Sequence, residues 1–300
     1  MVSFHVDTEL YPFAPHFFDL DGLAMHYADE GEADAPPVLF VHGNPTWSFY
    51  YRNLIQALSP THRCIAPDHI GCGKSDKPGD DAYAYRLERR VDDLTRLVDS
   101  LGLEQVSLVA HDWGGMIGMT WAHRHPDRVA RIALMNTAAF PLPASKRLPS
   151  SLWLTRTPLG AFLVRGFNAF GRGAVRFAAR RPLDPRVRDG LLAPYDSWQN
   201  RIAVLRFVQD IPLSAKDPGY DLLQEVAAAL PQFAATPFLI CWGDKDFVFD
   251  RHFLAEWERR LPSAEVVRFP EAGHYLLEDE KQKVVARIVD FIRNDAEETA

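Results

Sequence analysis

The sequence predicts an α/β fold, a mostly parallel, doubly wound sheet that carries an inserted all-helical cap. Short apolar runs that end in polar or glycine-rich turns alternate with helical patterns in the first half of the chain, which is typical of parallel strands covered on both faces. The alternation stops after Asn136 and resumes at Pro237, and the sequence between them is rich in Pro, Arg and Phe with helical spacing. We therefore expect a core of residues 1–139 and 232–300 and a cap of residues 140–231.

A hairpin begins the predicted sheet. Residues 17–20 and 23–27 are strand-like and flank Asp21-Gly22, a dipeptide that favours a tight turn between antiparallel strands. The edge of the sheet is therefore expected to be antiparallel. Later apolar patterns predict strands at 38–41, 64–66, 106–110, 132–135, 237–242 and 265–269 and helices at 85–101 and 281–294.

Composition and charge narrow the function. The 300 residues are 47% apolar, and their formal charge of −7 gives no basic field for a polyphosphate, so we expect a small substrate and no nucleic acid. Cys64, Cys72 and Cys241 are an odd number without paired metal spacing, which argues against a disulfide framework and indicates inert thiols in a reducing compartment. We expect neither a metal nor a cofactor. Residues 1–20 have no signal-peptide pattern and no apolar run reaches the ~18 residues of a membrane span, so we expect a cytoplasmic protein.

A strand-to-helix turn holds the candidate nucleophile. The strand at 106–110 leads into Ala110-His111-Asp112-Trp113-Gly114-Gly115, and a sharp turn of this kind requires small neighbours because its backbone is strained and closely packed. Asp112 occupies the position that serine usually takes, and a carboxylate there can attack carbon and form a covalent ester or anhydride. The alternative is that Asp112 only caps the following helix.

Four further residues complete a catalytic arrangement. The loop that begins at His42 follows the strand at 38–41, where an oxyanion hole is expected from the backbone N–H groups of Asn44 and Trp113. His274 follows the last predicted strand and Asp246 follows the preceding one, in the order nucleophile, acid, histidine. We expect His274 to act as base and Asp246, with Asp244 as a rival, to orient it.

The side chains around this arrangement predict an apolar substrate that carries or develops negative charge. The indole N–H of Trp113 and the amide of Asn44 are neutral donors that can hold and release an anion. Aromatic residues expected to line a pocket for long alkyl chains are Phe140, Phe170 and Trp198. The arginine-rich part of the cap is either a solvated face or a docking surface for an acidic protein or for membrane lipid, and it comprises Arg165, Arg172, Arg176, Arg180, Arg181, Arg186 and Arg188.

Two motifs resemble a known enzyme family. His42-Gly43-Asn44-Pro45-Thr46-Trp47-Ser48 and His111-Asp112-Trp113-Gly114-Gly115 are similar to the haloalkane dehalogenase branch of the α/β hydrolases, and the likeness spans nearly the whole chain. Within that branch, the segments at 67–71, 136–141 and 194–201 look most like the β-lactone decarboxylases of bacterial long-chain olefin biosynthesis.

The resemblance implies an activity and a set of roles. It implies conversion of a cis-3,4-dialkyl β-lactone to a cis-alkene and carbon dioxide, with Asp112 attacking either C4 or the lactone carbonyl, and with His274 and Asp246 as its partners. Asn44 and Trp113 would stabilise the anion. It also implies assembly with the other enzymes of olefin biosynthesis. The alternatives are a haloalkane dehalogenase, an epoxide hydrolase and a catalytically silent lipid-binding homologue.

Overall fold

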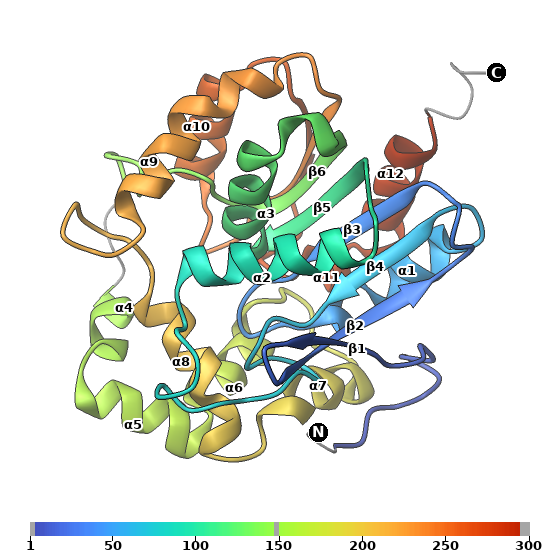
Figure 1. The fold of residues 1–300 in the computed structure, drawn as a ribbon. Coiled ribbons are helices and arrows are strands. Elements are labelled where there is room, and N and C mark those ends of the chain that lie inside the picture. Colours follow the sequence, from blue (N-terminus) through green and yellow to red (C-terminus); the bar gives the residue numbers. More distant parts are fainter. Residues whose placement is uncertain (1–3, 147–149, 295–300) are drawn as a thin grey trace.

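The centre of the molecule is a sheet of eight strands that is parallel except at one edge (Figure 1). The computed structural model describes residues 4–146 and 150–294. The strand order is β1-β2-β4-β3-β5-β6-β7-β8, and β1 and β2 form the antiparallel edge that was predicted. The strands are β1 His16–Leu20, β2 Leu23–Glu30, β3 Pro37–Val41, β4 Arg63–Pro67, β5 Val106–Asp112, β6 Val129–Thr137, β7 Phe238–Gly243 and β8 Glu265–Phe269.

Helices cover both faces of the sheet, as the continuous apolar strands predicted. Figure 1 shows α2 and α3 in front of the strands and α1 and α12 behind them. The core helices and short 3-10 turns are η1 Ser48–Tyr51, α1 Arg52–Leu58, α2 Leu87–Ser100, α3 Trp113–Arg124, η2 Pro126–Arg128, α10 Arg251–Arg260, α11 Leu276–Asp279 and α12 Lys281–Arg293.

Alternate residues of each strand enter different halves of the core. On β3, Leu39 and Val41 pack into the cluster formed with α2 and α3, whereas Val38 and Phe40 pack into the cluster formed with α1 and α12. All four side chains are fully buried. Successive side chains of a strand point to opposite faces, so a strand that is apolar at every position needs a helical layer on each side. This confirms the doubly wound α/β class.

Between β6 and β7 the described residues form helices and no strand. These helices are α4 Ser150–Thr155, α5 Pro158–Phe167, α6 Ala169–Phe177, α7 Pro185–Leu192, η3 Ala193–Tyr195, η4 Gln199–Arg201, α8 Ile202–Gln209, α9 Tyr220–Ala229 and η5 Leu230–Phe233. In Figure 1, α4 to α8 lie together below the carboxyl edge of the sheet, while α9 lies beside α10. Leu223 and Val226 of α9 join the core cluster that contains α3.

The boundaries of the cap therefore stay a prediction. The division at residues 140 and 231 groups α9 with the cap, although its buried side chains pack on the core. The first three and last six residues of the predicted core lie outside the described residues. Within the described ranges, no helix is both long enough and apolar enough to span a bilayer.

Candidate active site

Asp112 lies on a strained turn between β5 and α3. Its φ of 54° is in the left-handed region that non-glycine residues rarely adopt. The turn passes so close to β3 that a Cβ on Gly114 would lie 1.8 Å from the carbonyl oxygen of Val41, so a residue without a side chain is required there. The hydroxyl of Thr137, at the end of β6, donates a hydrogen bond to the Asp112 carbonyl. The turn is thus packed against β3 on one side and hydrogen-bonded to β6 on the other.

The Asp112 carboxylate does not cap the helix that follows it. Its side chain makes no capping hydrogen bond to α3. Oδ1 instead accepts a hydrogen bond of 2.6 Å from the backbone N–H of Asn44. The carboxylate also accepts a hydrogen bond from the backbone N–H of Trp113. Both predicted oxyanion-hole donors therefore interact with the carboxylate of Asp112 itself. The other oxygen, Oδ2, lies 3.5 Å from Nε2 of His274.

His274 connects Asp112 with Asp246. Its Nδ1 lies 2.8 Å from Oδ2 of Asp246, and all three side chains are buried. The rival carboxylate, Asp244, is turned away and pairs with Arg268 on the outer strand β8. The backbone carbonyl of His274 accepts a hydrogen bond of 2.9 Å from Nε2 of the buried His111, the residue that precedes Asp112.

Burial and charge shift the ionisation of this group of residues. Burial raises the pKa of Asp112, while the positive charge of His274 and the amides of Asn44 and Trp113 partly oppose that rise. Burial by itself lowers the pKa of His274, but the charge and hydrogen bond of Asp246, together with the charge of Asp112, raise it overall. The arrangement therefore favours an imidazolium between two carboxylates.

The two predicted neutral donors have different surroundings. Nδ2 of Asn44 donates a hydrogen bond of 3.1 Å to the carbonyl oxygen of Val204 on α8, which leaves its second N–H and links the oxyanion loop to the cap. The indole of Trp113 lines the cavity above Asp112, and no described residue accepts a hydrogen bond from it. Both side chains are more than nine-tenths buried, so an anion placed there would be shielded from water.

An apolar cavity of about 370 Å³ covers the carboxylate. Asp112 and His274 form its floor, and its walls come from α6, α8 and the loop after β7. Phe140 and Phe170 lie in these walls. Nearly all of the lining is apolar, including Met116, Leu142, Leu152, Phe177, Ile211, Leu213, Phe247 and Phe249.

The expectation that Trp198 lines the pocket is not met by its position. Its side chain is 47% exposed, and it lies outside the cavity against Phe162 of α5 and under the guanidinium of Arg165. Helical spacing indicates which aromatic residues share a face, but it does not say whether that face is turned inward or outward. The tertiary packing of α5 on α6 and α8 decides this.

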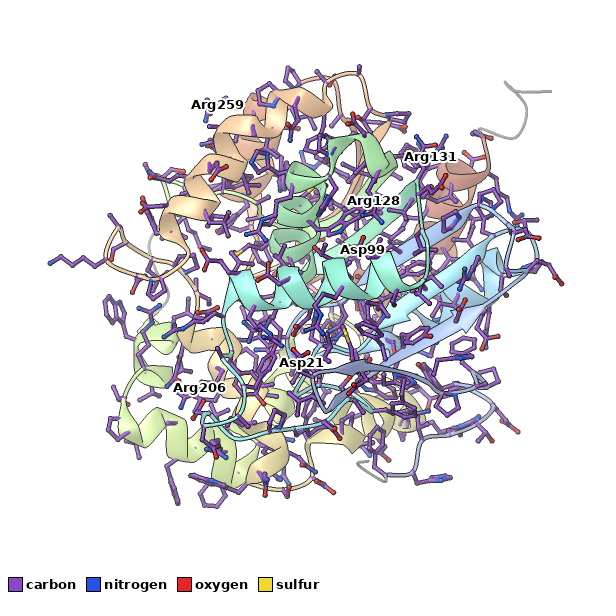
Figure 2. All side chains as sticks on the ribbon, viewed as in Figure 1. Asp21, Asp99, Arg128, Arg131, Arg206 and Arg259 are labelled. Carbon is purple, nitrogen blue, oxygen red and sulfur yellow. The ribbon has the colours of Figure 1, made fainter. Side chains whose placement is uncertain are left out.

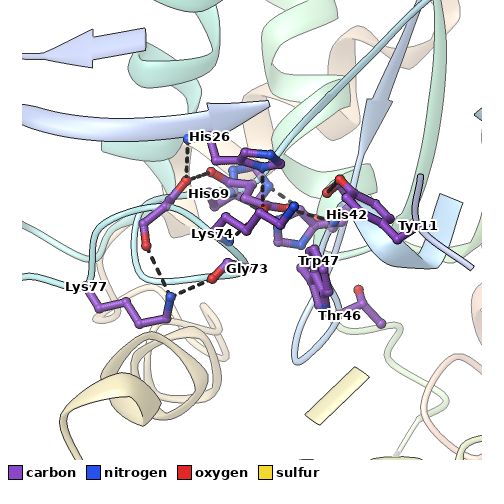
Figure 3. A network of polar contacts seen from close by, with 12 residues as sticks. Tyr11, His26, His42, Thr46, Trp47, His69, Gly73, Lys74 and Lys77 are labelled. Carbon is purple, nitrogen blue, oxygen red and sulfur yellow. Dashed lines mark hydrogen bonds and ion pairs between the residues drawn. The ribbon is translucent and has the colours of Figure 1, made fainter. Parts of the chain in front are cut away.

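A buried polar network behind the oxyanion loop was not recognised from the sequence (Figure 3). Asp68 follows β4, and its carboxylate accepts hydrogen bonds from the backbone N–H of Ser48 at 2.7 Å and contacts Nδ1 of His26 at 2.8 Å. The backbone N–H of His69 donates to Nε2 of His42 at 3.0 Å, and Nε2 of His69 lies 3.2 Å from the His42 carbonyl. These contacts fix both ends of the loop that carries Asn44.

A second unrecognised contact holds the loop that carries Asp246. Oδ1 of Asn136 accepts a hydrogen bond of 2.7 Å from the backbone N–H of Gly243, and its Nδ2 donates to the Gly243 carbonyl at 3.1 Å. The position of Asn136 near the carboxyl end of β6 and of Gly243 at the end of β7 was the available signal. Parallel strands bring such residues together at one edge.

The part of the chain that the structure describes contains no group of three or more potential metal ligands. Its three cysteines are buried and unpaired, and burial raises the pKa of Cys72 to about 11. The groups that the structure places at this site are a buried carboxylate, an imidazole and neutral hydrogen-bond donors.

Fold and site define the class of the protein. Residues 36–281 match the family model described as alpha/beta hydrolase fold, and the chain belongs to this family. A haloalkane dehalogenase from Bradyrhizobium elkani has a similar structure, with a TM-score of 0.85 and 30% identity over 94% of this chain and 98% of that one.

Two relatives of known name are more similar in sequence. The chain is 53% identical to a cis-3-alkyl-4-alkyloxetan-2-one decarboxylase from Shewanella oneidensis, over 96% of this chain and 90% of the relative. It is 47% identical to a protein of the same name from Xanthomonas campestris, over 95% and 98% of the two chains. An oxetan-2-one is a β-lactone, so these names agree with the resemblance found in the sequence.

Proposed function

We propose that this protein is a β-lactone decarboxylase that converts a cis-3-alkyl-4-alkyloxetan-2-one to a cis-alkene and carbon dioxide. The observation that carries the proposal is the buried Asp112 carboxylate, paired with His274, at the floor of an almost entirely apolar cavity. The two decarboxylases that share about half of their residues with this chain support the same substrate class.

We assign the first step to attack by Oδ2 of Asp112 on C4 of the lactone. The C4–O bond breaks with inversion, the ring oxygen becomes part of a free carboxylate on C3, and Asp112 becomes esterified to C4. The C3–carboxylate bond then breaks, its electrons form the C3=C4 double bond, and the Asp112 carboxylate leaves from the opposite side. Inversion followed by anti elimination preserves the cis geometry and consumes neither a proton nor water.

The state of the oxyanion hole supports this route over attack on the lactone carbonyl. The Asn44 N–H already donates to Oδ1 of Asp112 at 2.6 Å, so the hole stabilises the carbonyl oxygen that Asp112 acquires as an ester. The alternative route forms an anhydride and requires the lactone oxygen to replace Oδ1 there, with His274 then managing the C4 alkoxide proton. In the C4 route, Trp113 and the free N–H of Asn44 hold the departing carboxylate.

Products formed from two substrate classes test the function. We would incubate the purified protein with a cis-dialkyl β-lactone and, separately, with a panel of bromo- and iodoalkanes, and measure alkene by gas chromatography and halide release. Alkene with retained cis geometry is the expected result. Halide release without alkene would instead identify a haloalkane dehalogenase, the second candidate, which the structural neighbour from Bradyrhizobium elkani supports.

His274→Gln distinguishes the two routes. Because C4 attack moves no proton, the variant is expected to retain appreciable alkene formation, whereas Asp112→Asn should retain none. A loss in His274→Gln as complete as in Asp112→Asn would contradict the C4 route. Circular dichroism of both variants would check that the fold is intact.

Two further candidate functions, an epoxide hydrolase and a catalytically silent lipid-binding homologue, receive less support. Epoxide hydrolases usually place two cap tyrosines over the epoxide oxygen, but Tyr195 is buried with its hydroxyl donating to the Thr46 carbonyl, and neither it nor Tyr220 lines the cavity. A silent lipid-binding homologue would bind alkyl chains without a covalent adduct on Asp112. The proximity of Asp112, His274 and Asp246 supports turnover instead.

We also propose that the protein assembles with other enzymes of long-chain olefin biosynthesis. Support comes from exposed aromatic residues on the outer side of the cap, where Phe162 contacts Phe167 and Trp198 and each of the three is about half exposed. Exposed clusters of this kind are typical of interaction sites. Co-purification with the lactone-forming enzyme would test the assembly, and loss of co-purification in Phe162→Ser would locate it. The cytoplasmic location stays a prediction.

A further inference from the structure

The rim of the cavity combines exposed apolar side chains with arginines. Three large residues line the cavity and are also exposed to solvent, namely Phe177 at 60%, Phe247 at 56% and Val248 at 36%. Phe177 ends α6, and the other two lie in the loop after β7. The cavity therefore reaches the surface between α6 and this loop, and the surface around that opening is apolar.

The arginines of this part of the cap differ in whether a carboxylate pairs with them. Arg181, Arg186 and Arg188 form ion pairs with Glu280, with Asp7 and Glu9, and with Asp189. Among the described residues, no acidic side chain pairs with the exposed Arg172, Arg176 or Arg180. The Arg176 guanidinium lies 5.2 Å from the ring centre of Phe177, so unpaired positive charge and the apolar rim meet on α6.

The charge of the chain is strongly segregated. Residues 150–188 contain eight arginines and one acidic residue, although the whole chain has a formal charge of −7. Asp21 and Asp99 are among the charged residues that lie on the core (Figure 2). An anionic surface would repel most of this protein and attract the cap, which gives the attraction a defined orientation.

We infer that the cavity mouth docks on an anionic lipid bilayer. Phe177, Phe247 and Val248 would enter the interfacial region, and Arg172, Arg176 and Arg180 would pair with lipid phosphates, the combination by which amphipathic elements bind membrane surfaces. Docking in this orientation places the opening against the bilayer. A dialkyl substrate then enters and an alkene leaves without crossing water, and this last statement rests on the proposed function.

Vesicle flotation tests the docking directly. We would compare vesicles of phosphatidylcholine alone with vesicles that also contain phosphatidylglycerol, at low and high salt. The protein is expected to bind only the anionic vesicles and to dissociate as salt rises. The double variant Arg172→Ala/Arg176→Ala should bind about 25-fold more weakly, since each basic residue near such a surface contributes about a five-fold change in affinity.

A matched control removes two arginines elsewhere. Arg124 is the last residue of α3, the helix whose first residues lie at the active site, and Arg259 lies on α10, away from α4 to α8 (Figures 1 and 2). Arg124→Ala/Arg259→Ala has the same net charge as the first double variant but should bind like the unchanged protein. An equal loss in both double variants would overturn the inference. Equal binding to neutral and anionic vesicles would also overturn it. Binding to neither kind of vesicle would overturn it as well, and would instead favour an acidic protein surface as the partner of the arginines.

Activity measurements separate this inference from the proposed function. Arg172→Ala/Arg176→Ala should turn over a short-chain, water-soluble cis-dialkyl β-lactone at the unchanged rate and should be slower only on a long-chain lactone presented in anionic vesicles. Equal rates on the vesicle-borne lactone for both proteins would contradict delivery through the docked mouth. If the unchanged protein turned over neither lactone, the proposed function would fail while flotation would still decide the docking.

Discussion

The carboxyl edge of the sheet and the cap that covers it are built in opposite ways. At the sheet edge, Asp112, Asp246 and His274 are buried and joined by polar contacts of 3.5 and 2.8 Å, and each lies in a turn that further buried residues hold in place. In the cap, short helices supply an apolar wall and leave Phe162, Phe167 and Phe177 more than half exposed. The sheet edge therefore fixes the positions of the reacting groups, whereas the cap supplies apolar surface for the substrate.

This difference separates chemistry from substrate selection. A carboxylate that must attack one carbon needs a fixed geometry, because small displacements of a reacting group are costly. Alkyl chains need only a nonpolar space of sufficient volume, since apolar contacts are not directional. Changes at the sheet edge should therefore alter the reaction itself, and changes in the cap should alter which chain lengths react.

The largest expected effect follows from removing the nucleophile. Asp112→Asn keeps an oxygen for the Asn44 amide but loses the attacking carboxylate, so alkene formation should fall by a factor of about 10⁴ or more. Product analysis by gas chromatography measures this fall, and the thermal unfolding midpoint checks the fold. Residual turnover within ten-fold of the unchanged protein would rule out Asp112 as nucleophile.

A smaller effect is expected from filling the cavity. Ala174 of α6 lines it, so Ala174→Phe should lower kcat/KM for long-chain lactones by about ten-fold or more relative to short-chain ones, the scale of a few methylene contacts. The comparison of kcat/KM over a series of chain lengths measures the change. Trp198→Ala, a variant of an exposed residue outside the cavity, serves as the control and should leave the chain-length profile unaltered.

The smallest expected effect is a shift in pH dependence. Asp112 must be ionised to attack, so activity should fall as pH decreases through its pKa, which burial raises above the usual value for an aspartate. The positive charge of His274 lowers that pKa. Removing this charge in His274→Gln should therefore move the acid limb of the kcat/KM profile to higher pH.

The control for the pH profile is a histidine outside the site. His123 lies on α3 and contacts Glu225 on the surface, so His123→Gln should leave the acid limb in place. An unchanged limb in His274→Gln would show that Asp112 and His274 do not interact electrostatically and would weaken the comparison between the two regions.

Much of the core could be predicted because its signals are local. An uninterrupted apolar run such as 38–41 requires burial on both faces, and Asp21-Gly22 sets a hairpin whose strands pair with Leu20 opposite Leu23. The order of Asp112, Asp246 and His274 along the chain likewise follows from strands that end at one edge. The structure brings these three residues together as that order requires.

The polar contacts that support the site could not be predicted in the same way. Asp68 and Ser48 are twenty residues apart, yet they join through a single hydrogen bond, and no periodicity marks either one. Nothing in the local sequence around Asn136 indicates that its amide hydrogen-bonds to the backbone of Gly243. Such pairs depend on which loops meet, and that follows from strand order and not from local sequence.

The sequence by itself determined the α/β class, the antiparallel edge, the site of the strained turn and the kinds of side chain around it, because period, turn chemistry and motif order are local properties. Only the tertiary structure decided that the Asn44 amide holds Oδ1 of Asp112, that Phe140 and Phe170 face the cavity and that Trp198 faces away from it. The orientation of a helix face and the meeting of distant loops depend on how whole elements pack, because burial is a property of the assembled chain.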